Sequence, residues 1–267
     1  MFTVGLVQLT STDDREENLR QVTRWVREAA ARGAQLVALP ENFSYIGPET
    51  GKLSLAEPLE GPLMDRLRAL ARETGVWLLA GGFPEQSDDP TRVFNTAALL
   101  DRDGNLVATY RKIHLFDIDL AAGVTLQESR TVRPGSTPVV AQTPWGTVGL
   151  SICYDLRFPE LYRRLIDAGA KVLFVPSAFT LYTGKDHWRT LLQARAIENT
   201  AYVAAPAQFG QHGNKRQSYG RSLLVDPWGQ IIAEAPDRPG ILLGEIDIEH
   251  LEQIRKQLPS LQHRRLS

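Results

Sequence analysis

Cysteine is nearly absent from this sequence. Its 267 residues include one cysteine, Cys153. A single cysteine cannot form a disulfide within the chain, which excludes a disulfide framework and fits a reducing compartment. Residues 1–8 lack the basic segment of a signal peptide and lead directly into a predicted strand. We therefore expect a cytoplasmic protein.

The sequence also lacks an excess of charge of either sign, and it lacks long apolar runs. Lys and Arg number 30 against 31 for Asp and Glu, a net charge of −1. Without a basic stripe or an acidic tail, neither nucleic acid nor a membrane is expected as a partner. No apolar run approaches membrane-spanning length. The 5 histidines are scattered without the spacing of metal ligands, and no metal or other cofactor is expected.

What is present is the composition of an ordinary globular protein, 43% hydrophobic and 23% charged. We expect a single domain over residues 1–267, with residues 258–267 as a basic C-terminal tail. Apolar periodicity predicts strands at residues 2–9, 35–39, 76–82, 93–100, 106–110, 138–142, 145–152, 171–175, 201–205, 218–225, 231–234 and 240–246. It predicts helices at residues 15–31, 63–74, 187–199 and 248–257, and one that begins at Pro159.

The remaining stretches are predicted to be irregular. Residues 50–61 are expected to form a loop, and residues 111–135 show no clean period although they are rich in charge. Hairpins among strand–helix–strand units favour a layered α/β domain with mixed sheets.

Cys153 stands where a buried strand ends. Residues 146–152 are small or β-branched and uncharged, the residues after Cys153 are polar, and Pro159 opens a helix. This places the thiol at the carboxyl edge of a sheet, where α/β proteins bind ligands. A lone cysteine after an apolar strand is more often a small buried hydrophobe than a nucleophile, so its interpretation depends on other residues.

Two other strand ends carry reactive groups. Glu41 follows Leu39 and Pro40, and Lys112 ends a hairpin strand. A thiolate, a carboxylate and an ammonium together suit attack on an amide or nitrile carbon. The sulfur attacks, the carboxylate moves the proton to the departing nitrogen, and the ammonium with a backbone N–H offsets the charge on oxygen. Taken singly, Glu41 is explained equally well as a solvated surface carboxylate, and Lys112 is better explained as a solvated surface lysine.

Three blocks of the sequence resemble a known family. Leu-Pro-Glu-Asn at 39–42, Arg-Lys-Ile-His-Leu at 111–115 and Gly-Leu-Ser-Ile-Cys-Tyr-Asp-Leu-Arg-Phe-Pro-Glu at 149–160 resemble the signature blocks of the nitrilase superfamily, the carbon–nitrogen hydrolases. The resemblance covers nearly the whole chain in the expected order. It implies an α-β-β-α sandwich, with Glu41 as general base, Lys112 as oxyanion stabiliser and Cys153 as nucleophile. It also implies a homodimer or higher homo-oligomer, with the tail at 258–267 as a candidate to cross to the partner.

Within the superfamily the chain looks most like the Nit-type branch of ω-amidases and deaminated-glutathione amidases. That resemblance implies that Glu128 orients Lys112 or the substrate, and that the backbone amide of Tyr154 completes the oxyanion site. It implies that Arg157 meets a substrate carboxylate, for which the planar guanidinium is suited. Phe179 and Thr183 match substrate-wall positions. Alternatives remain, because Arg157 could pair with nearby carboxylates, and loop packing explains Phe179 and Thr183 nearly as well.

The sequence thus predicts a hydrolase that cleaves the C–N bond of a small linear amide carrying a carboxylate. The reaction passes through a cysteine thioester and releases ammonia, so the expected partners are an amide substrate and water. An N-carbamoyl amide hydrolase is the alternative among enzymes. A catalytically silent binding domain of the same fold is the alternative of another class. It is disfavoured because the four charged or thiol positions, Glu41, Lys112, Glu128 and Cys153, are all intact.

Overall fold

A computed structural model describes residues 1–120, 124–213 and 216–266 of the protein. Within these residues one sheet has the strand order β17-β1-β2-β3-β4-β5, with β8 beside β4. Its strands are β1 (Phe2–Gln8), β2 (Leu36–Ala38), β3 (Trp77–Glu85), β4 (Val93–Leu100), β5 (Leu106–Arg111), β8 (Val132–Arg133) and β17 (Gly240–Ile246). The first three pair in parallel, and β17, β4 and β5 add antiparallel edges, so the sheet is mixed.

A second sheet lies against the first with the order β16-β15-β12-β11-β10-β9. Its strands are β9 (Val139–Thr143), β10 (Gly146–Leu150), β11 (Val172–Phe174), β12 (Tyr202–Ala205), β15 (Leu223–Val225) and β16 (Ile231–Glu234). Two separate hairpins stand beside the sheets, one formed by β6 (Asp117–Leu120) and β7 (Val124–Gln127), the other by β13 (Phe209–His212) and β14 (Arg216–Tyr219).

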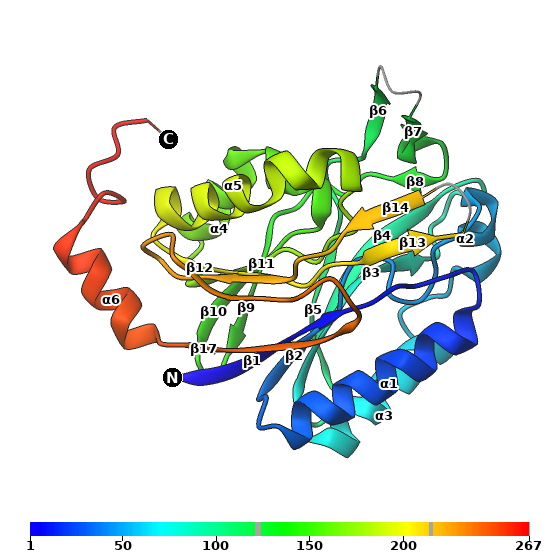
Figure 1. Cartoon of the computed structure of the whole chain (residues 1–267), viewed down its shortest axis with the longest axis horizontal. Helices are drawn as coiled ribbons and strands as arrows, with labels where there is room; N and C mark the ends of the chain where they lie inside the picture. Colours follow the sequence, from blue (N-terminus) through cyan, green and yellow to red (C-terminus); the bar gives the residue numbers. More distant parts are fainter. Residues whose placement is uncertain (121–123, 214–215, 267) are drawn as a thin grey trace.

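The helices form the outer layers. They are α1 (Arg15–Ala31), α2 (Glu49–Leu55), α3 (Pro62–Thr74), α4 (Pro159–Asp167), α5 (Leu181–Asn199) and α6 (Ile248–Gln257), with short 3₁₀ turns η1 (Glu128–Arg130) and η2 (Cys153–Arg157). Helices α1 and α3 cover the first sheet, and α4 and α5 cover the second (Figure 1). The α-β-β-α sandwich predicted from the sequence is confirmed.

Alternating side chains of the parallel strands fill two cores. Leu36 and Ala38 of β2 join the cluster shared by the two sheets, whereas Val37 and Leu39 join the cluster beneath α1 and α3. Successive side chains of a strand point to opposite faces, and here both faces are covered. That is why the strand reads in the sequence as an unbroken apolar run.

Several predicted elements are confirmed residue for residue. The helices at 15–31 and 248–257 and the strands at 93–100 and 240–246 have the expected bounds. Asp14 caps α1 by accepting a hydrogen bond from the backbone N–H of Glu17 at 2.9 Å. Gly75 ends α3 with a φ of 67°, a left-handed conformation that favours glycine.

Two segments predicted to be irregular and one predicted strand are wrong. The expected loop at 50–61 contains most of α2, a seven-residue helix that buries only Lys52 and so shows no apolar stripe. The expected irregular segment at 111–135 contains the β6–β7 hairpin, η1 and β8. The strand expected at 218–225 is two strands in different sheets, because Gly220 (φ 77°) and Arg221 (φ 60°) turn the chain between them.

Two further elements are longer than predicted. Helix α5 begins at Leu181 rather than at residue 187, because Thr180 caps it through its hydroxyl. The first turns of α5 expose Leu181 and Tyr182, so their apolar residues do not form the inward-facing pattern on which the prediction depended. Strand β3 continues to Glu85 through a bulge, whereas the prediction ended it at residue 82.

The part of the chain that the structure describes contains no helix long and apolar enough to cross a membrane.

Candidate active site

Cys153 occupies a sharp turn between strand β10 and helix α4. Its φ is 50°, an uncommon conformation for a residue with a side chain. Its backbone N–H donates to the carbonyl of Pro176, at the end of β11, at 2.9 Å. The turn then tightens into η2, so the backbone N–H of Tyr154 stands in its first turn, where such groups have no partner within the helix. Such strained positions cluster at functional sites.

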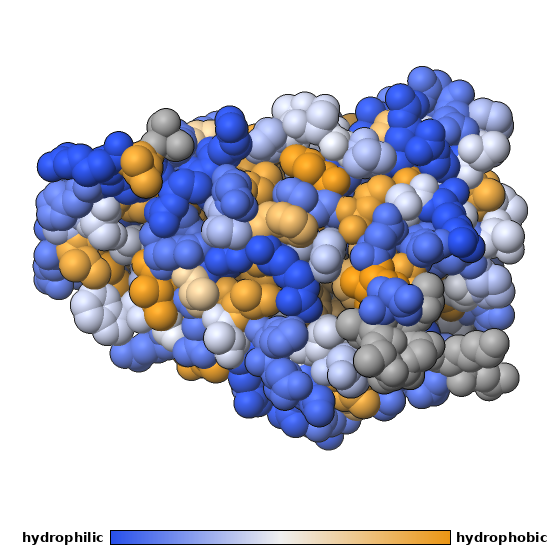
Figure 2. All heavy atoms as spheres, turned by 90° about the horizontal axis from the view of Figure 1, so that it is seen from above, coloured by the Kyte–Doolittle hydropathy of each residue, from blue (hydrophilic) through white to orange (hydrophobic). Residues whose placement is uncertain are grey.

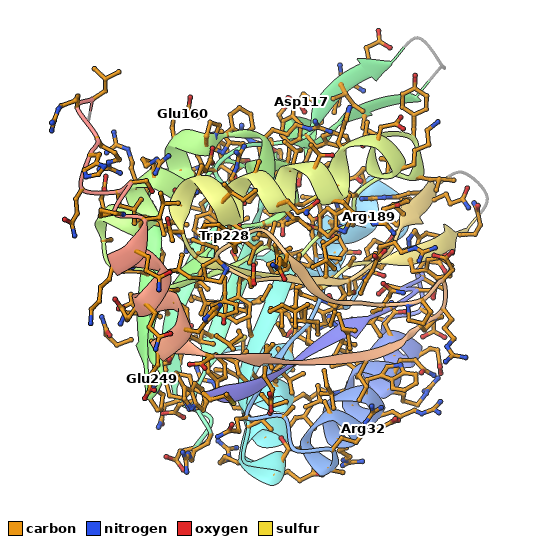
Figure 3. The ribbon with its side chains drawn as sticks, turned by 60° about the vertical axis from the view of Figure 1, so that its left-hand side comes forward. Arg32, Asp117, Glu160, Arg189, Trp228 and Glu249 are labelled. Atoms are coloured by element: carbon orange, nitrogen blue, oxygen red, sulfur yellow. The ribbon has the colours of Figure 1, made fainter. Side chains whose placement is uncertain are left out.

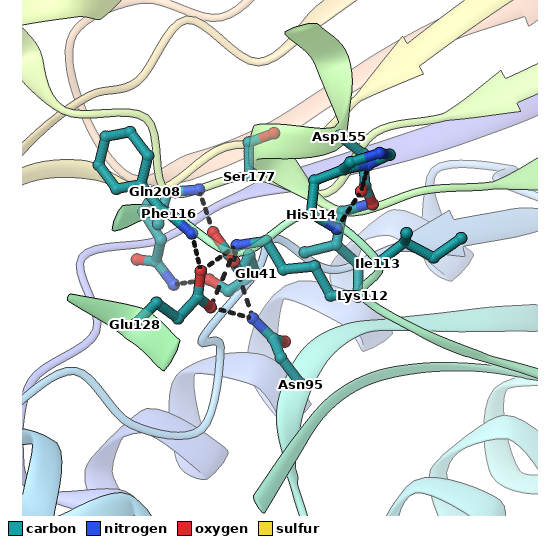
Figure 4. A network of polar contacts seen from close by, with 12 residues as sticks. Glu41, Asn95, Lys112, Ile113, His114, Phe116, Glu128, Asp155, Ser177 and Gln208 are labelled. Carbon is teal, nitrogen blue, oxygen red and sulfur yellow. Dashed lines mark hydrogen bonds and ion pairs between the residues drawn. The ribbon is translucent and has the colours of Figure 1, made fainter. Parts of the chain in front are cut away.

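The buried carboxylate of Asp155 holds this turn. Its Oδ2 accepts hydrogen bonds from the Ile152 N–H at 2.8 Å and the Tyr110 hydroxyl at 2.7 Å. Its Oδ1 accepts from the His114 N–H at 3.1 Å and lies 2.7 Å from the His114 Nδ1 (Figure 4). Burial, reinforced by the Asp155 charge, raises the pKa of Tyr110 well above its ordinary value, so the phenol keeps the proton that it donates. Asp155 thereby ties the end of β5 to the cysteine turn.

Lys112 lies at the centre of a buried ionic cluster (Figure 4). Its Nζ donates to Glu41 Oε1 at 2.9 Å and to both oxygens of Glu128, at 3.1 and 2.9 Å. The side chains of Lys112 and Glu41 are 2% and 3% exposed. All three ammonium protons therefore have carboxylate acceptors, as a buried charge requires.

Backbone and amide donors fix both carboxylates. The Ala178 N–H donates to Glu41 Oε2 at 2.9 Å, and the Phe116 N–H donates to Glu128 Oε2 at 2.7 Å. Asn95 bridges the two acids, since its Nδ2 lies 2.9 Å from Glu41 Oε1 and 3.2 Å from Glu128 Oε1. The sequence reading missed Asn95, although a polar residue inside the apolar strand 93–100 was a usable signal.

A two-glycine bulge in β3 makes room for this cluster. The pairing of β3 with β4 shifts register between Ala80 and Phe83, across Gly81 and Gly82. A Cβ on Gly82 would lie 2.1 Å from Asn95 Oδ1 and 3.1 Å from Glu41 Cγ. Only glycine therefore allows the strand to pass so close to the two polar side chains.

The electrostatics of the cluster keep Lys112 charged. Burial disfavours the ammonium, but the Glu128 and Glu41 carboxylates outweigh it and hold the pKa of Lys112 well above its ordinary value. Burial likewise opposes ionisation of Glu128, but Lys112 and then Lys52 hold the pKa of that carboxyl below its ordinary value. The ammonium and this carboxylate are thus fixed charges at neutral pH.

Cys153 is a neutral thiol in the same surroundings. Burial, and next the charge of Glu41, raise the pKa of the Cys153 thiol well above its ordinary value, while Lys112 opposes them more weakly. A thiol in this state becomes a nucleophile only if a base takes its proton as it attacks.

A pocket opens onto these groups. Its lining residues come from strand ends, from α2 and from the β6–β7 and β13–β14 hairpins: Glu41, Asn42, Glu49, Lys52, Lys112, Phe116, Leu126, Gln127, Glu128, Cys153, Ala178 and Arg216. A smaller pocket adjoins it and shares Phe116, Cys153 and Ala178. Cys153 therefore lies at the junction of the two.

The structure places the other predicted residues around the smaller pocket. Tyr154, Phe179 and Thr183 line it. Arg157 lines neither pocket: its guanidinium lies 5.7 Å from the Tyr154 ring centre and 5.4 Å from that of Phe179, and 3.3 Å from His187 Nδ1. In the described ranges 1–120, 124–213 and 216–266 no cluster of His, Cys, Asp or Glu is arranged to hold a metal ion.

Fold and site together define a sandwich protein with a thiol, a carboxylate and a buried ammonium around one pocket. The chain belongs to the carbon–nitrogen hydrolase family, whose model matches residues 3–256. It is therefore a hydrolase of carbon–nitrogen bonds, and the resemblance to the nitrilase superfamily is confirmed.

The similar proteins agree on the branch. A deaminated glutathione amidase of Synechocystis sp. is 47% identical over 266 residues, 98% of each chain. Nit3 of Saccharomyces cerevisiae, a branch 10 member of the nitrilase superfamily, matches with a TM-score of 0.90 at 32% identity over 99% of this chain and 97% of its own. The NitFhit protein of C. elegans matches with a TM-score of 0.93 at 40% identity, and this chain covers 65% of it.

One solved structure bears on the cysteine. A variant of the amidase from Nesterenkonia sp. AN1 is 27% identical, with a TM-score of 0.83 over 99% of this chain and 94% of its own. It carries the acetamide moiety of fluoroacetamide covalently bound to its active-site cysteine.

Proposed function

We propose that the protein is an amidase that hydrolyses small linear amides carrying a carboxylate, through a thioester on Cys153. The observation that carries this proposal is the buried contact of Lys112 with Glu41 and Glu128 beside the Cys153 thiol. Residues 1–267 would act as one catalytic unit. The similarity to a deaminated glutathione amidase supports deaminated glutathione, or an ω-amide of similar chemistry, as the substrate.

Glu41 acts as the general base and acid. As Cys153 Sγ attacks the carbonyl carbon, its proton moves to the Glu41 carboxylate. Glu41 then passes this proton to the amide nitrogen, the C–N bond breaks, and ammonia or an amine leaves the acyl thioester. Water adds to the thioester while Glu41 takes its proton, and return of that proton to sulfur restores the thiol with release of the acid.

Lys112 and the Tyr154 backbone N–H stabilise the oxyanion of each tetrahedral intermediate. Glu128 does not transfer a proton in this scheme. With a pKa below its ordinary value, it remains an anion that positions the Lys112 ammonium. A fixed ammonium in a buried site offsets developing charge more strongly than a mobile one in water.

The smaller pocket receives the part of the substrate that lies beside the reacting carbonyl. Tyr154, Phe179 and Thr183 form its wall, and Arg157 braces the two aromatic rings from outside. The contact of Arg157 with a substrate carboxylate stays a prediction. The covalent adduct on the cysteine of the Nesterenkonia amidase supports covalent chemistry at Cys153.

Product release from three substrates tests the proposal. Deaminated glutathione, α-ketoglutaramate and an N-carbamoyl amino acid are compared with the unmodified chain and with Cys153→Ala. We expect turnover of at least one of the first two and a loss of at least about 10³-fold in Cys153→Ala. Turnover of the N-carbamoyl compound alone would favour the alternative hydrolase. Turnover that survives the substitution would rule out the thioester.

The protein is further proposed to form a homodimer or higher homo-oligomer through the face that carries α5. Hydrophobic side chains lie between hydrophilic ones on the face seen in Figure 2. Leu181, Ile197 and Trp228 are 38%, 53% and 56% exposed, and Trp228 lies in the turn beside α5 (Figure 3). A mass equal to one chain in light scattering would contradict this proposal.

The described part of the C-terminal tail packs on its own chain. Arg264 pairs with Asp167 at 2.6 Å, and Leu261 packs against the central core. Crossing of the tail to a partner stays a prediction. A cytoplasmic location also remains a proposal, supported by the single cysteine. Fractionation of cells that express the chain would test it.

A further inference from the structure

Arg216 points to a function that the hydrolytic scheme leaves unused. It opens strand β14 and lines the larger pocket together with Cys153 and Lys112. Among residues 1–120, 124–213 and 216–266, its buried Nε has no hydrogen-bond partner and its guanidinium forms no ion pair. Buried polar groups without partners are rare, and one that faces a pocket commonly awaits an ion or ligand.

Helix α2 brings a second cation to the same part of the pocket. Lys52, 7% exposed, donates to Glu49 Oε2 at 2.8 Å, and that oxygen also accepts from Thr131 Oγ1 at 3.1 Å. Glu49 is thereby occupied by partners other than Arg216, although the Arg216 charge still helps to lower its pKa. Two cations therefore share one carboxylate, which leaves this end of the pocket with a formal charge of +1.

The end beside the thiol has the opposite balance. Glu41 and Glu128 carry two negative charges against one positive charge on Lys112, a formal charge of −1. A substrate carboxylate is repelled from that end and attracted to the Arg216 end. Lys52 acts on both Glu49 and Glu128. Arg216 is therefore the cation left to meet a substrate carboxylate, and its position orients an amide whose carbonyl must reach Cys153.

We propose that Arg216, supported by Lys52, binds a carboxylate of the amide substrate and so determines the specificity of the enzyme for acidic amides. The guanidinium suits this role because its planar fork pairs with both oxygens of a carboxylate. The inference rests on the proposed function and adds a residue to it. It assigns the carboxylate to the larger pocket, whereas Arg157 lies outside both pockets.

Binding to the inert Cys153→Ala chain tests this proposal separately from catalysis. Glutaramate carries a carboxylate at the end opposite its amide, and pentanamide has the same chain length without it. Calorimetry gives Kd for both ligands in Cys153→Ala and in the same chain with Arg216→Ala. We expect Arg216→Ala to reduce the preference for glutaramate over pentanamide by roughly 10- to 100-fold. The kcat/KM ratio of the two amides in the active chain should fall by a similar factor.

Two arginine variants serve as comparisons. Arg102→Ala removes an exposed arginine from the β4–β5 turn, and Arg157→Ala removes the other predicted carboxylate ligand. If Arg216→Ala changes the preference no more than Arg102→Ala does, the proposal is wrong, whatever Arg157→Ala shows. Arg216→Gln, which keeps a polar side chain without the charge, gives the same decision if Arg216→Ala fails to fold.

The two proposals fail in different ways. Suppose that Cys153→Ala prefers glutaramate over pentanamide, that this preference depends on Arg216, and that the active chain turns over neither amide. That result would contradict the hydrolytic scheme alone. If turnover depends on Cys153 but the preference for glutaramate is unchanged in Arg216→Ala, the carboxylate site alone is contradicted.

Discussion

The two ends of the larger pocket are built on different principles. At the reaction end, Lys112 and Glu41 are 2% and 3% exposed and every ammonium proton has an acceptor. At the other end, the Glu49 side chain is 38% exposed and the Arg216 Nε has no partner among the residues that the structure describes. Chemistry requires charges that are fixed before the substrate arrives, whereas selection requires a charge that the substrate itself satisfies.

The largest expected effect is a difference in catalytic activity between variants at the two ends of the pocket. Glu41→Gln removes the proposed base for the buried Cys153 thiol, so we expect kcat to fall by roughly 10²- to 10⁴-fold. Glu49→Gln, at the other end, should act mainly on KM. Steady-state kinetics on one amide compares them, and an equal fall in kcat for both variants would contradict the division of roles.

The raised pKa of the Cys153 thiol gives a second measurement on the same variants. At neutral pH the unmodified chain should be alkylated by iodoacetamide faster than Glu41→Gln, because the loss of the proposed proton acceptor outweighs the fall in the pKa of the Cys153 thiol that the loss of the Glu41 charge brings. In Glu41→Gln, the alkylation rate should rise with pH as hydroxide removes the proton instead. A rate that is independent of pH across the neutral range would show that the thiol is already ionised.

Removal of one lysine from each end of the pocket should lower the free energy of unfolding by different amounts. Lys112→Met leaves two buried carboxylates without their cation, and we expect a loss of about 3–5 kcal/mol in the free energy of unfolding. Lys52→Met breaks a pair whose carboxylate is partly exposed, so about 0.2–1 kcal/mol is expected. Urea unfolding of both variants measures the difference. Glu128→Gln added to Lys112→Met should restore part of the loss.

A smaller effect is expected from the support behind the reaction end. Asp155→Asn presents an amide N–H₂ to groups that now donate to a carboxylate, and should cost about 1–3 kcal/mol. Asp101→Asn is the control, because Asp101 also accepts backbone hydrogen bonds but lies in an exposed turn, and should stay within about 1 kcal/mol. Equal losses by thermal unfolding would deny Asp155 its role in joining β5 to the cysteine turn.

The smallest expected effect is a change in the pH dependence of stability. The folded pKa of Glu128 lies below its ordinary value, so its ionised form stabilises the fold at pH above about 4.3, the unfolded value. That contribution is lost as the pH falls from there through the folded pKa. Glu128→Gln should therefore unfold with a shallower loss of stability on acidification. An unchanged slope would show that Lys112 does not hold this carboxylate ionised.

The reaction end could be predicted from the sequence, and the selecting end could not. Glu41, Lys112 and Cys153 each follow an apolar strand, so local pattern and chemistry identify them together. Lys52 lies on a seven-residue helix whose pattern resembles a loop, and Arg216 lies two residues before the strand predicted at 218–225. Short exposed elements bury too little apolar surface to impose a detectable period.

The sequence by itself predicted the candidate reactive groups and a layered α/β domain with mixed sheets that carries them. Apolar runs decide which strands are buried, and the residue after each run is then placed at a sheet edge. Only the tertiary structure decided how the charges are paired. Lys112 and Glu41 are 71 residues apart in the chain, and nothing local in either segment encodes the glycine bulge, the Asn95 bridge or the place of Arg216 in the pocket lining. Pairing energies depend on distance and burial in three dimensions, which arise only when all the segments have packed together.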